Sequence, residues 1–245
     1  MTNKKKKNIL KSFAFRILYP TSEKYLSKER SYSYKTITVT VFPGVFHPGF
    51  YFSTKLLLKY LENVELNKKY ILELGAGTGL ISIFAANKGG YVTASDISLT
   101  AVYNIEKNVK MTNANVEVVH SDLFDDIPQR KYDYIIINPP YYPKDPQNEY
   151  EQAWFCGSNF QFFTKFFNQL GLYSDKYSKT IMILSEDCDT NKISEIAENN
   201  SFTFEVINRK RKWGEWNYLY RIVKMADPVS SDSSGYEKDL HNKPE

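Results

Sequence analysis

Short apolar segments alternate with segments of helical periodicity from Tyr70 onward, and this alternation restricts the fold of the chain more than any other feature. An apolar run of about five residues has the length of a buried strand. An amphipathic segment between two such runs supplies the crossover that parallel strands require. The order predicts an α/β fold with a parallel sheet covered by helices on both faces. The expected strands are residues 70–74, 91–95, 116–120, 132–137 and 180–184, and the expected helices are residues 79–87, 99–111, 159–170 and 190–198.

The alternation stops after the fifth expected strand. Residues 202–208 and 216–224 both have the composition of strands, and only residues 209–215 separate them. This connection is too short for a helical crossover, so the two segments are expected to form an antiparallel hairpin. The complete prediction is a mostly parallel sheet of seven strands that ends in an antiparallel hairpin.

The rest of the chain consists of an N-terminal segment before residue 70 and a C-terminal segment after residue 224. Residues 31–46 alternate as strands do, and residues 54–61 resemble an amphipathic helix packed beside the sheet. The first 12 residues and the segment from Ala226 onward have the composition of disordered chain. The expected organisation is a basic N-terminal extension (1–45), an α/β domain (46–225) and a disordered tail (226–245).

The composition is that of a globular protein, with 42% hydrophobic residues and two cysteines, Cys156 and Cys188. The cysteines lie far apart without partners at the spacing of metal ligands, so we expect reduced thiols and no metal site. No segment approaches the ~18 apolar residues of a membrane-spanning helix. The N-terminal lysines precede no signal-peptide core. We therefore expect a cytoplasmic protein with no membrane partner.

The positive charge is unevenly distributed. Residues 1–70 contain 14 Lys or Arg against 4 Asp or Glu, whereas residues 71–245 contain 18 against 24. A basic segment next to a domain attracts phosphate-rich partners such as structured RNA, although a solvated tail has the same composition. A second basic group, residues 209–212 beside Trp213, is expected at the tip of the hairpin, where it contacts either phosphate or only solvent.

A glycine-rich turn, Glu-Leu-Gly-Ala-Gly-Thr-Gly, follows the first expected strand and contains Gly75, Gly77 and Gly79. Glycines allow the backbone to approach a ligand where a Cβ would collide. A dinucleotide-binding turn usually reads G-x-G-x-x-G, and here the third glycine comes one residue earlier. The carboxylate of Glu73 would repel a pyrophosphate but attract an ammonium or sulfonium group. The turn favours a cationic ligand, with a purely structural turn as the alternative.

Two further carboxylates follow the next two expected strands. Asp96 lies 23 residues after Glu73, where a Rossmann-like fold presents a carboxylate to ribose hydroxyls. After the third strand, Asp122 is placed to accept a hydrogen bond from an adenine amine, and Leu123 to supply a backbone N–H and an apolar wall. Each carboxylate alone is also explained as a helix cap or a solvated side chain. Their repetition at successive strand ends favours a nucleoside site.

The tetrapeptide Asn-Pro-Pro-Tyr, residues 138–141, follows the apolar segment 134–137 and comes 59 residues after Gly79. It is therefore expected at the carboxyl end of a strand buried on both faces, where open α/β sheets bind ligands. An amide or exocyclic amine nitrogen is a poor nucleophile because its lone pair is delocalised, so a catalyst needs hydrogen-bond acceptors that orient the NH₂ group. Consecutive prolines hold such acceptors in place, and Tyr141 is expected to stack on the planar group. An ordinary turn is the alternative.

Over residues 38–224 these motifs resemble the class I S-adenosylmethionine-dependent methyltransferases, in the subgroup with a (D/N)-P-P-(Y/F) tetrapeptide after the fourth strand. The resemblance implies a Rossmann-like fold, S-adenosylmethionine as cofactor and no metal. It also implies that residues 46–225 are the catalytic domain. The cofactor contacts implied are the ammonium group at Glu73, the methionine moiety at Gly75, Gly77 and Gly79, the ribose at Asp96, and the adenine at Asp122 and Leu123.

In the same subgroup, the Asn side-chain carbonyl and the carbonyl of the first Pro accept the two N–H bonds of the substrate. By position these are Asn138 and Pro139. The segment around Val41–Phe46 resembles ribosomal RNA guanine methyltransferases and, with the basic front, favours an exocyclic amine in ribosomal or transfer RNA. Residues 151–157 resemble release-factor glutamine methyltransferases, which makes protein glutamine N5-methylation the alternative. A non-catalytic nucleotide-binding module is the third hypothesis.

Overall fold

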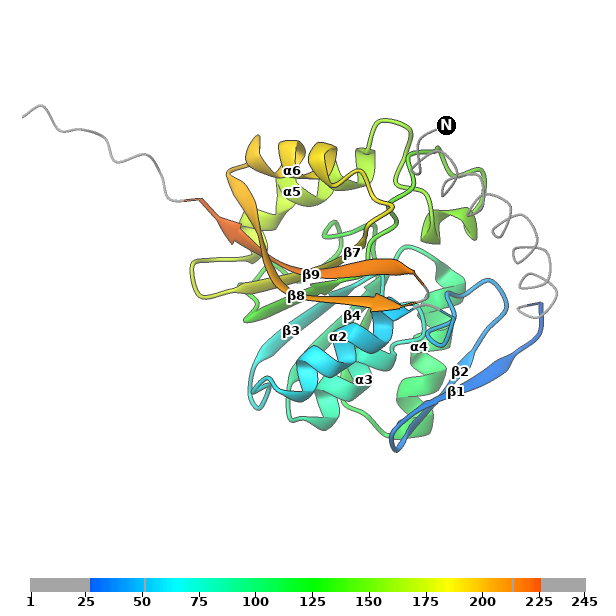
Figure 1. Cartoon of the computed structure of the whole chain (residues 1–245). Helices are drawn as coiled ribbons and strands as arrows, with labels where there is room; N and C mark the ends of the chain where they lie inside the picture. The colour runs from blue at the N-terminus through cyan, green and yellow to red at the C-terminus, as the bar shows by residue number, and fades with distance from the viewer. Residues whose placement is uncertain (1–26, 51, 213, 226–245) are drawn as a thin grey trace, which may run out of the picture.

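The computed structural model describes residues 27–50, 52–212 and 214–225 (Figure 1). The strands in these residues are β1 (Arg30–Tyr34), β2 (Ile37–Val41), β3 (Tyr70–Leu74), β4 (Tyr91–Asp96), β5 (Val116–His120), β6 (Tyr134–Ile137), β7 (Lys179–Ser185), β8 (Phe202–Lys212) and β9 (Glu215–Lys224). The helices are α2 (Phe52–Glu62), α3 (Leu80–Asn87), α4 (Leu99–Thr112), α5 (Gln161–Tyr173) and α6 (Thr190–Glu198), with a short 3₁₀ helix, η1 (Glu151–Ala153).

Within the described residues, seven strands form one sheet in the order β5-β4-β3-β6-β7-β9-β8, and β1 and β2 form a separate hairpin. Neighbouring strands from β5 to β7 are parallel, whereas β9 is antiparallel to both β7 and β8. The predicted mostly parallel sheet with a terminal antiparallel hairpin is confirmed.

Several element boundaries differ from those expected. The strand predicted at 132–137 begins at Tyr134, and the single extended segment 31–46 is resolved into the β1–β2 hairpin. The hairpin connector predicted at 209–215 is wrong in extent, because β8 continues to Lys212 and β9 begins at Glu215. Cross-strand pairing therefore extends through the basic segment. Trp213 and the two segments predicted to be disordered, 1–12 and 226–245, lie outside the described residues.

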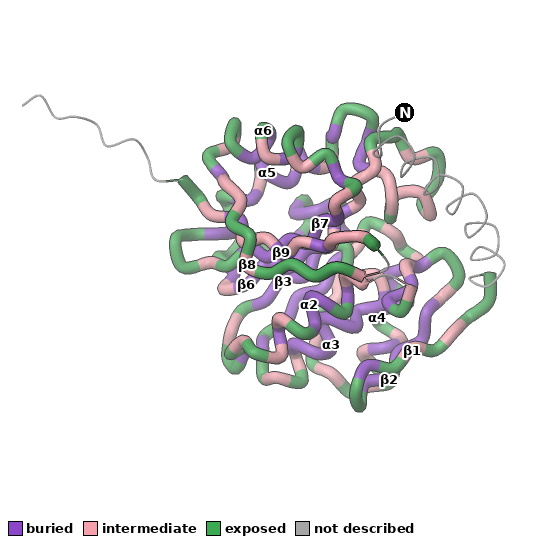
Figure 2. The backbone as a smooth tube through the Cα atoms, in the orientation of Figure 1, coloured by how far each residue is buried: buried purple, intermediate pink, exposed green. Residues whose placement is uncertain are grey.

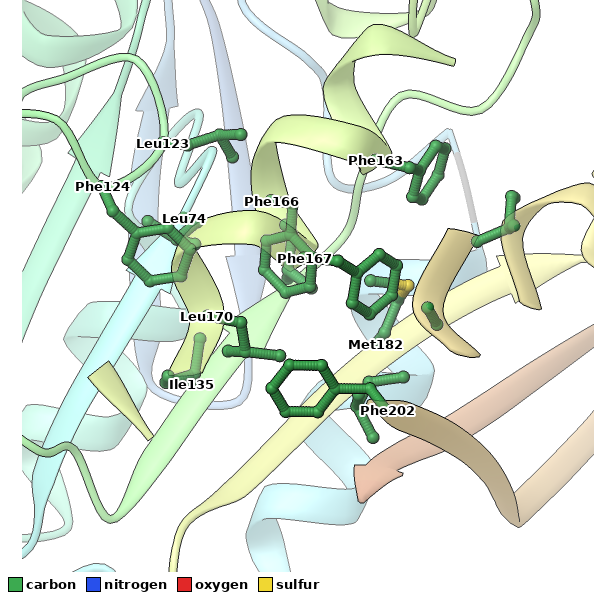
Figure 3. Packing of buried hydrophobic residues seen from close by; sticks show 14 of the residues in the cluster. Leu74, Leu123, Phe124, Ile135, Phe163, Phe166, Phe167, Leu170, Met182 and Phe202 are labelled. Atoms are coloured by element: carbon green, nitrogen blue, oxygen red, sulfur yellow. The ribbon is translucent and has the colours of Figure 1, made fainter. Parts of the chain in front are cut away.

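The unbroken apolar run of β6 is explained by burial on both faces of the sheet. Ile136 packs with residues of α2 and α3 on one face, and Ile135 and Ile137 pack with residues of α5 and α6 on the other. Figure 3 shows part of this second cluster, where Phe167 of α5 lies near Phe202 of β8, with ring centroids 6.1 Å apart. Because helices cover both faces of the sheet, a ligand can reach it at the ends of the parallel strands.

The β1–β2 hairpin is attached to the main sheet through two fully buried asparagines of α4. The Thr40 backbone N–H donates to Asn108 Oδ1 (2.7 Å), and the Thr40 carbonyl accepts from Asn104 Nδ2 (3.0 Å) and Asn108 Nδ2 (2.8 Å). Asn108 Nδ2 also donates to the carbonyl of Thr78 in the glycine-rich turn (2.9 Å). One side chain thus joins the hairpin to the turn, and the loop after β2 is held beside it.

Three sequence expectations concern a membrane-spanning helix, a metal site and the two cysteines. In the part of the chain that the structure describes, no helix combines the length and apolar character needed to cross a bilayer. Among the same residues, no group of three or more His, Cys, Asp or Glu side chains is arranged to hold a metal ion. Cys156 and Cys188 are free and buried.

Candidate active site

A cavity lies at the carboxyl ends of the parallel strands. Its floor includes Glu73 of β3, Asp96 of β4, Asn138 after β6 and Ser185 of β7. Leu74 and Ile137 are direct partners in the β3–β6 ladder, so the glycine-rich turn and the Asn-Pro-Pro-Tyr segment leave the sheet side by side. The other walls come from the loop after β2, the loop after β6 and the β8–β9 hairpin, and they include Val45, Phe46, Pro48, Glu149, Gln152, Trp154, Lys212, Glu215 and Asn217.

The glycine-rich turn has the conformation that its glycines were expected to allow. Gly75, Gly77 and Gly79 have φ angles of 67°, 55° and 74°, in the left-handed region that disfavours other residues. A Cβ on Gly79 would lie 2.9 Å from Ile105 Cγ2 of α4, so this position also requires the close approach of two segments. A Cβ on Gly75 would meet no atom within 4 Å and would project into space beside the turn. The turn thus leaves room for a ligand along its backbone.

Asp96 stabilises the turn from the neighbouring strand. Its Oδ2 accepts from the Gly77 backbone N–H (2.9 Å), and its Oδ1 accepts from the Ser98 backbone N–H (3.0 Å). Burial raises the pKa of Asp96, and these backbone hydrogen bonds oppose that shift. A carboxylate has about four lone-pair sites, so acceptor capacity remains for two ligand hydroxyls.

Glu73 is the most deeply buried carboxyl group of the cavity, with 5% of its surface exposed. Burial raises its pKa to about 8, an effect opposed by the hydrogen bond from Ser82 Oγ and reinforced by the charge of Asp96. A buried carboxyl group with this pKa takes up a proton in the empty cavity at neutral pH and ionises when a cation approaches.

The residues of the tetrapeptide all line the cavity. Within the described residues the Asn138 side-chain amide forms no hydrogen bond. The Tyr141 ring packs against the core and contacts the Tyr142 ring, with 4.8 Å between the ring centroids. Burial raises the pKa of the Tyr141 hydroxyl well above its usual value, and a hydrogen bond with Ser185 opposes the shift. The structure therefore places Asn138, Pro139 and Tyr141 together, and their substrate contacts stay a prediction.

Two predicted cofactor residues lie elsewhere. Asp122 is exposed and forms an ion pair with Lys165 of α5 (2.6 Å), which also binds Asp125 (2.6 Å). Leu123 is buried in the cluster beneath α5, with a φ angle of 57°. Neither residue is among those that line the cavity. Their contact with adenine stays a prediction that this geometry does not support.

Sequence reasoning missed Glu149, Ser185 and Asn217 of the cavity wall. Glu149 Oε1 accepts from the Thr100 backbone N–H at the start of α4 (3.3 Å), and the Trp154 ring contacts Phe46 at 5.5 Å between centroids. The loop after β6 thus reaches over the cavity to α4 and to the loop after β2. Ser185 and Asn217, which are direct partners in the β7–β9 ladder, form a buried polar wall. The position of Ser185 at a parallel strand end was a signal that could have identified it.

Comparison with known proteins identifies the family. The methyltransferase small domain family matches residues 36–156, which include the glycine-rich turn, Asp96 and the tetrapeptide. This chain carries a methyltransferase small domain. A putative protein N5-glutamine methyltransferase of Methanocaldococcus jannaschii is 41% identical over 108 residues, which are 44% of this chain and 52% of that protein. Ribosomal RNA small subunit methyltransferase C of Buchnera aphidicola is 36% identical over 112 residues, which are 44% of this chain and 32% of that protein.

The similarity thus spans about half the length of the first relative and a third of the second. A solved structure, the Thermus thermophilus 16S rRNA N2 G1207 methyltransferase in complex with AdoMet and guanosine, superposes with a TM-score of 0.62 at 19% identity. The match covers 82% of this chain and 51% of that one. At this identity the likeness shows the fold alone, a Rossmann-like α/β fold.

S-adenosylmethionine is the cofactor of this family, and the cavity of the methyltransferase domain fits it. The backbone of the glycine-rich turn is open to a ligand because the glycines have no Cβ. The Asp96 carboxylate can accept further hydrogen bonds, from ribose hydroxyls, beside the one from Gly77. The buried Glu73 can pair with the ammonium group of the ligand. These are the residues that would hold the cofactor.

The raised pKa of Glu73 predicts pH-dependent cofactor binding. Below pH 8 the carboxyl group is protonated in the empty cavity, and pairing with the ligand ammonium requires the carboxylate, so binding releases a proton. Titration calorimetry should show the affinity for S-adenosylhomocysteine rising with pH by roughly tenfold per unit between pH 6 and 8. Glu73→Gln should bind more weakly and without this slope, and Glu106→Gln, on the exposed face of α4, should behave as the wild type. A flat wild-type profile contradicts the assignment.

Proposed function

We propose that this protein is an S-adenosylmethionine-dependent N-methyltransferase that acts on a planar NH₂ group, with an exocyclic base amine in ribosomal or transfer RNA as the substrate. One observation carries the proposal. The glycine-rich turn and the Asn-Pro-Pro-Tyr segment leave the paired strands β3 and β6 at the same edge and line one cavity. A methyl donor on the turn and an amine at the tetrapeptide would be adjacent.

The chemistry follows from the acceptors at the end of β6. The Asn138 side-chain oxygen and the Pro139 carbonyl accept the two N–H bonds of the amine, which turns the nitrogen lone pair toward the methyl donor. The same oxygens stabilise the positive charge that develops on nitrogen during transfer. The two prolines restrict the backbone, so the acceptors need little reorganisation when the substrate binds. When bound, the cofactor supplies a methyl group activated by a sulfonium.

Three observations support an RNA base as the substrate. The rings of Phe46 and Trp154 meet at the cavity wall and offer flat apolar surface, on which nucleic-acid bases stack. Four cationic residues at the end of β8 lie next to the same cavity, which Lys212 helps to line. The Buchnera relative is named as a ribosomal RNA methyltransferase.

A protein glutamine is the second candidate substrate. Its side-chain amide is also a planar NH₂ group, and the same two acceptors would bind it. The Methanocaldococcus relative, at 41% identity over 108 residues, is named as a putative protein N5-glutamine methyltransferase. A non-catalytic nucleotide-binding module is the remaining alternative, and it requires cofactor binding without transfer.

Radioactive methyl transfer separates these functions. The purified protein with methyl-labelled S-adenosylmethionine is incubated either with ribosomal and transfer RNA or with a release factor. We expect label in the RNA fraction that is sensitive to ribonuclease and resistant to protease, and located on a base amine by mass spectrometry of nucleosides. Label on a glutamine of the release factor, with none in RNA, would select the second candidate. Cofactor binding without label in either substrate would favour the non-catalytic module.

A further inference from the structure

The last four residues of β8, Arg209, Lys210, Arg211 and Lys212, are all cationic, and we call them the basic ridge. β8 is the outermost strand of the sheet, so its outer edge has no neighbouring strand in the described structure. Arg209, Lys210 and Arg211 are exposed and Lys212 is partly buried, and Figure 2 shows β8 as a largely exposed edge. The ridge is therefore open to a large partner.

The paired strand β9 contacts the two arginines of the basic ridge. Arg211 is the direct cross-strand partner of Trp216, and Arg209 is that of Tyr218. Both guanidinium groups lie over the Trp216 ring, with their central carbons 5.4 Å (Arg209) and 6.0 Å (Arg211) from its centroid. A guanidinium group attracted to the face of a ring still has N–H donors that are available to phosphate oxygens.

Nearby acids leave the ridge with an excess of positive charge. In the described part of the chain, Arg209, Lys210 and Arg211 form no ion pair. Glu205, on the same strand, is already paired with Arg221. Glu215 of β9 is the direct cross-strand partner of Lys212, and Glu186 follows β7, where its backbone N–H donates to the Trp216 carbonyl. Three of the four cations of the ridge are therefore not neutralised by an ion pair within the described residues.

The ridge leads into the cavity. Lys212, at its end, lines the cavity together with Glu215 and Asn217 of β9, and its Nζ lies 5.1 Å from the centroid of the Phe52 ring. Because a strand rises about 3.3 Å per residue, Arg209 lies about 10 Å along the edge from Lys212. A chain bound along β8 would therefore reach the cavity wall at Lys212, and the Asn-Pro-Pro-Tyr segment lies across the same cavity, after β6.

We propose that the basic ridge binds the sugar-phosphate backbone of the RNA substrate and positions the target nucleotide at the cavity. The inference rests on the proposed RNA methylation and adds the surface that binds the RNA. Closely spaced cations at the mouth of a site attract a polyanion and lower the substrate concentration needed for saturation. Charges on an edge strand also prevent unwanted strand pairing, but that role alone would leave RNA binding unchanged when they are removed.

A charge-neutralising variant tests the ridge. Arg209→Gln/Lys210→Gln/Arg211→Gln removes three cations and retains Lys212 in the cavity wall. The matched control is Lys68→Gln/Lys110→Gln/Lys176→Gln. It removes three exposed cations that come before β3, β5 and β7, toward the amino ends of these strands and away from the cavity. Binding of a fluorescein-labelled single-stranded RNA and methylation kinetics with ribosomal RNA are measured over a range of salt concentrations.

We expect the ridge variant to bind RNA about 10- to 100-fold more weakly at low salt and its salt dependence, log K against log salt, to decrease in slope by roughly 2. The KM for RNA should rise while kcat at saturation and S-adenosylhomocysteine affinity stay within about twofold of the wild type, since the chemical groups are intact. The control has the same net charge as the ridge variant but should bind and methylate RNA as the wild type does. This KM-against-kcat split distinguishes substrate positioning from general destabilisation.

Equal RNA affinity and salt slope in the ridge and control variants would overturn the inference, while methylation of RNA by both would leave the proposed function standing. If the wild type labels no RNA, the substrate proposal fails, and the binding measurement still decides whether the ridge contacts RNA. If the ridge variant loses methylation of a release factor instead, the surface serves an acidic protein, and the RNA inference is wrong.

Discussion

Replacing Asn138 by alanine should lower methyl transfer by about 100- to 1000-fold, the range observed when one preorganised polar group at a reacting centre is removed. The side-chain oxygen is one of two proposed acceptors for the substrate amine, and the Pro139 carbonyl cannot orient the NH₂ group alone. The affinity for S-adenosylhomocysteine should stay within about twofold, because the glycine-rich turn and Asp96 are unchanged. Single-turnover rates and calorimetry measure the two quantities.

Two matched variants make this result specific to the acceptor. Asn138→Asp keeps an oxygen in place and should retain at least a tenth of the wild-type rate, as the alternative residue of the subgroup motif. Asn168→Ala, on the exposed face of α5, should have the wild-type rate. If Asn138→Ala keeps activity comparable to the wild type, the acceptor mechanism is refuted.

Replacing Asp96 by alanine should weaken S-adenosylhomocysteine binding by about 100-fold or more. Its carboxylate has two remaining acceptor positions for the ribose hydroxyls, and hydrogen bonds to a charged group are each worth about 1.5–3 kcal/mol. The substitution also removes the bond from the Gly77 backbone N–H, so the turn loses one of its supports. Calorimetric titration gives the affinity, and thermal unfolding without ligand separates the loss of binding from a loss of stability.

Asp125→Asn is the matched control, since this exposed carboxylate pairs with Lys165 away from the cavity. It should bind the ligand as the wild type does. Asp122→Asn then tests the predicted adenine contact: a weakening confined to Asp122 would support it, and identical behaviour of the two variants would assign both carboxylates to Lys165 alone. If Asp96→Ala binds S-adenosylhomocysteine with unchanged affinity, the assignment of the nucleoside site to the carboxyl ends of these strands is wrong.

Local patterns were enough to predict the sheet. The apolar run of β6 and its neighbours has the length and composition of doubly buried strands, and the short segment before β9 excluded a crossover, so both the parallel part and the hairpin followed. The extent of β8 did not follow, because Arg209 and Arg211 have no apolar alternation. They are strand residues through their cross-strand contacts with Tyr218 and Trp216, which lie on another segment.

Some residues of the candidate site could also be predicted from local patterns, and others could not. Motifs that leave adjacent strands at one edge, such as the glycine-rich turn, Asp96 and the tetrapeptide, meet as expected. Asp122 also follows a parallel strand, yet its carboxylate pairs with Lys165, 43 residues away in the chain. Glu149 reaches the cavity through a loop without periodicity, so no local pattern marked it.

The sequence by itself determined the order of strands and helices and the edge at which the ligand-binding loops emerge, because side-chain periodicity and turn chemistry act over a few residues. Only the tertiary structure decided which polar groups meet: Asn108 with Thr40 and Thr78, Asp122 with Lys165, and the end of β8 with the cavity. The physical reason is that these contacts join segments far apart in the chain, and their partners are selected by packing of the whole core.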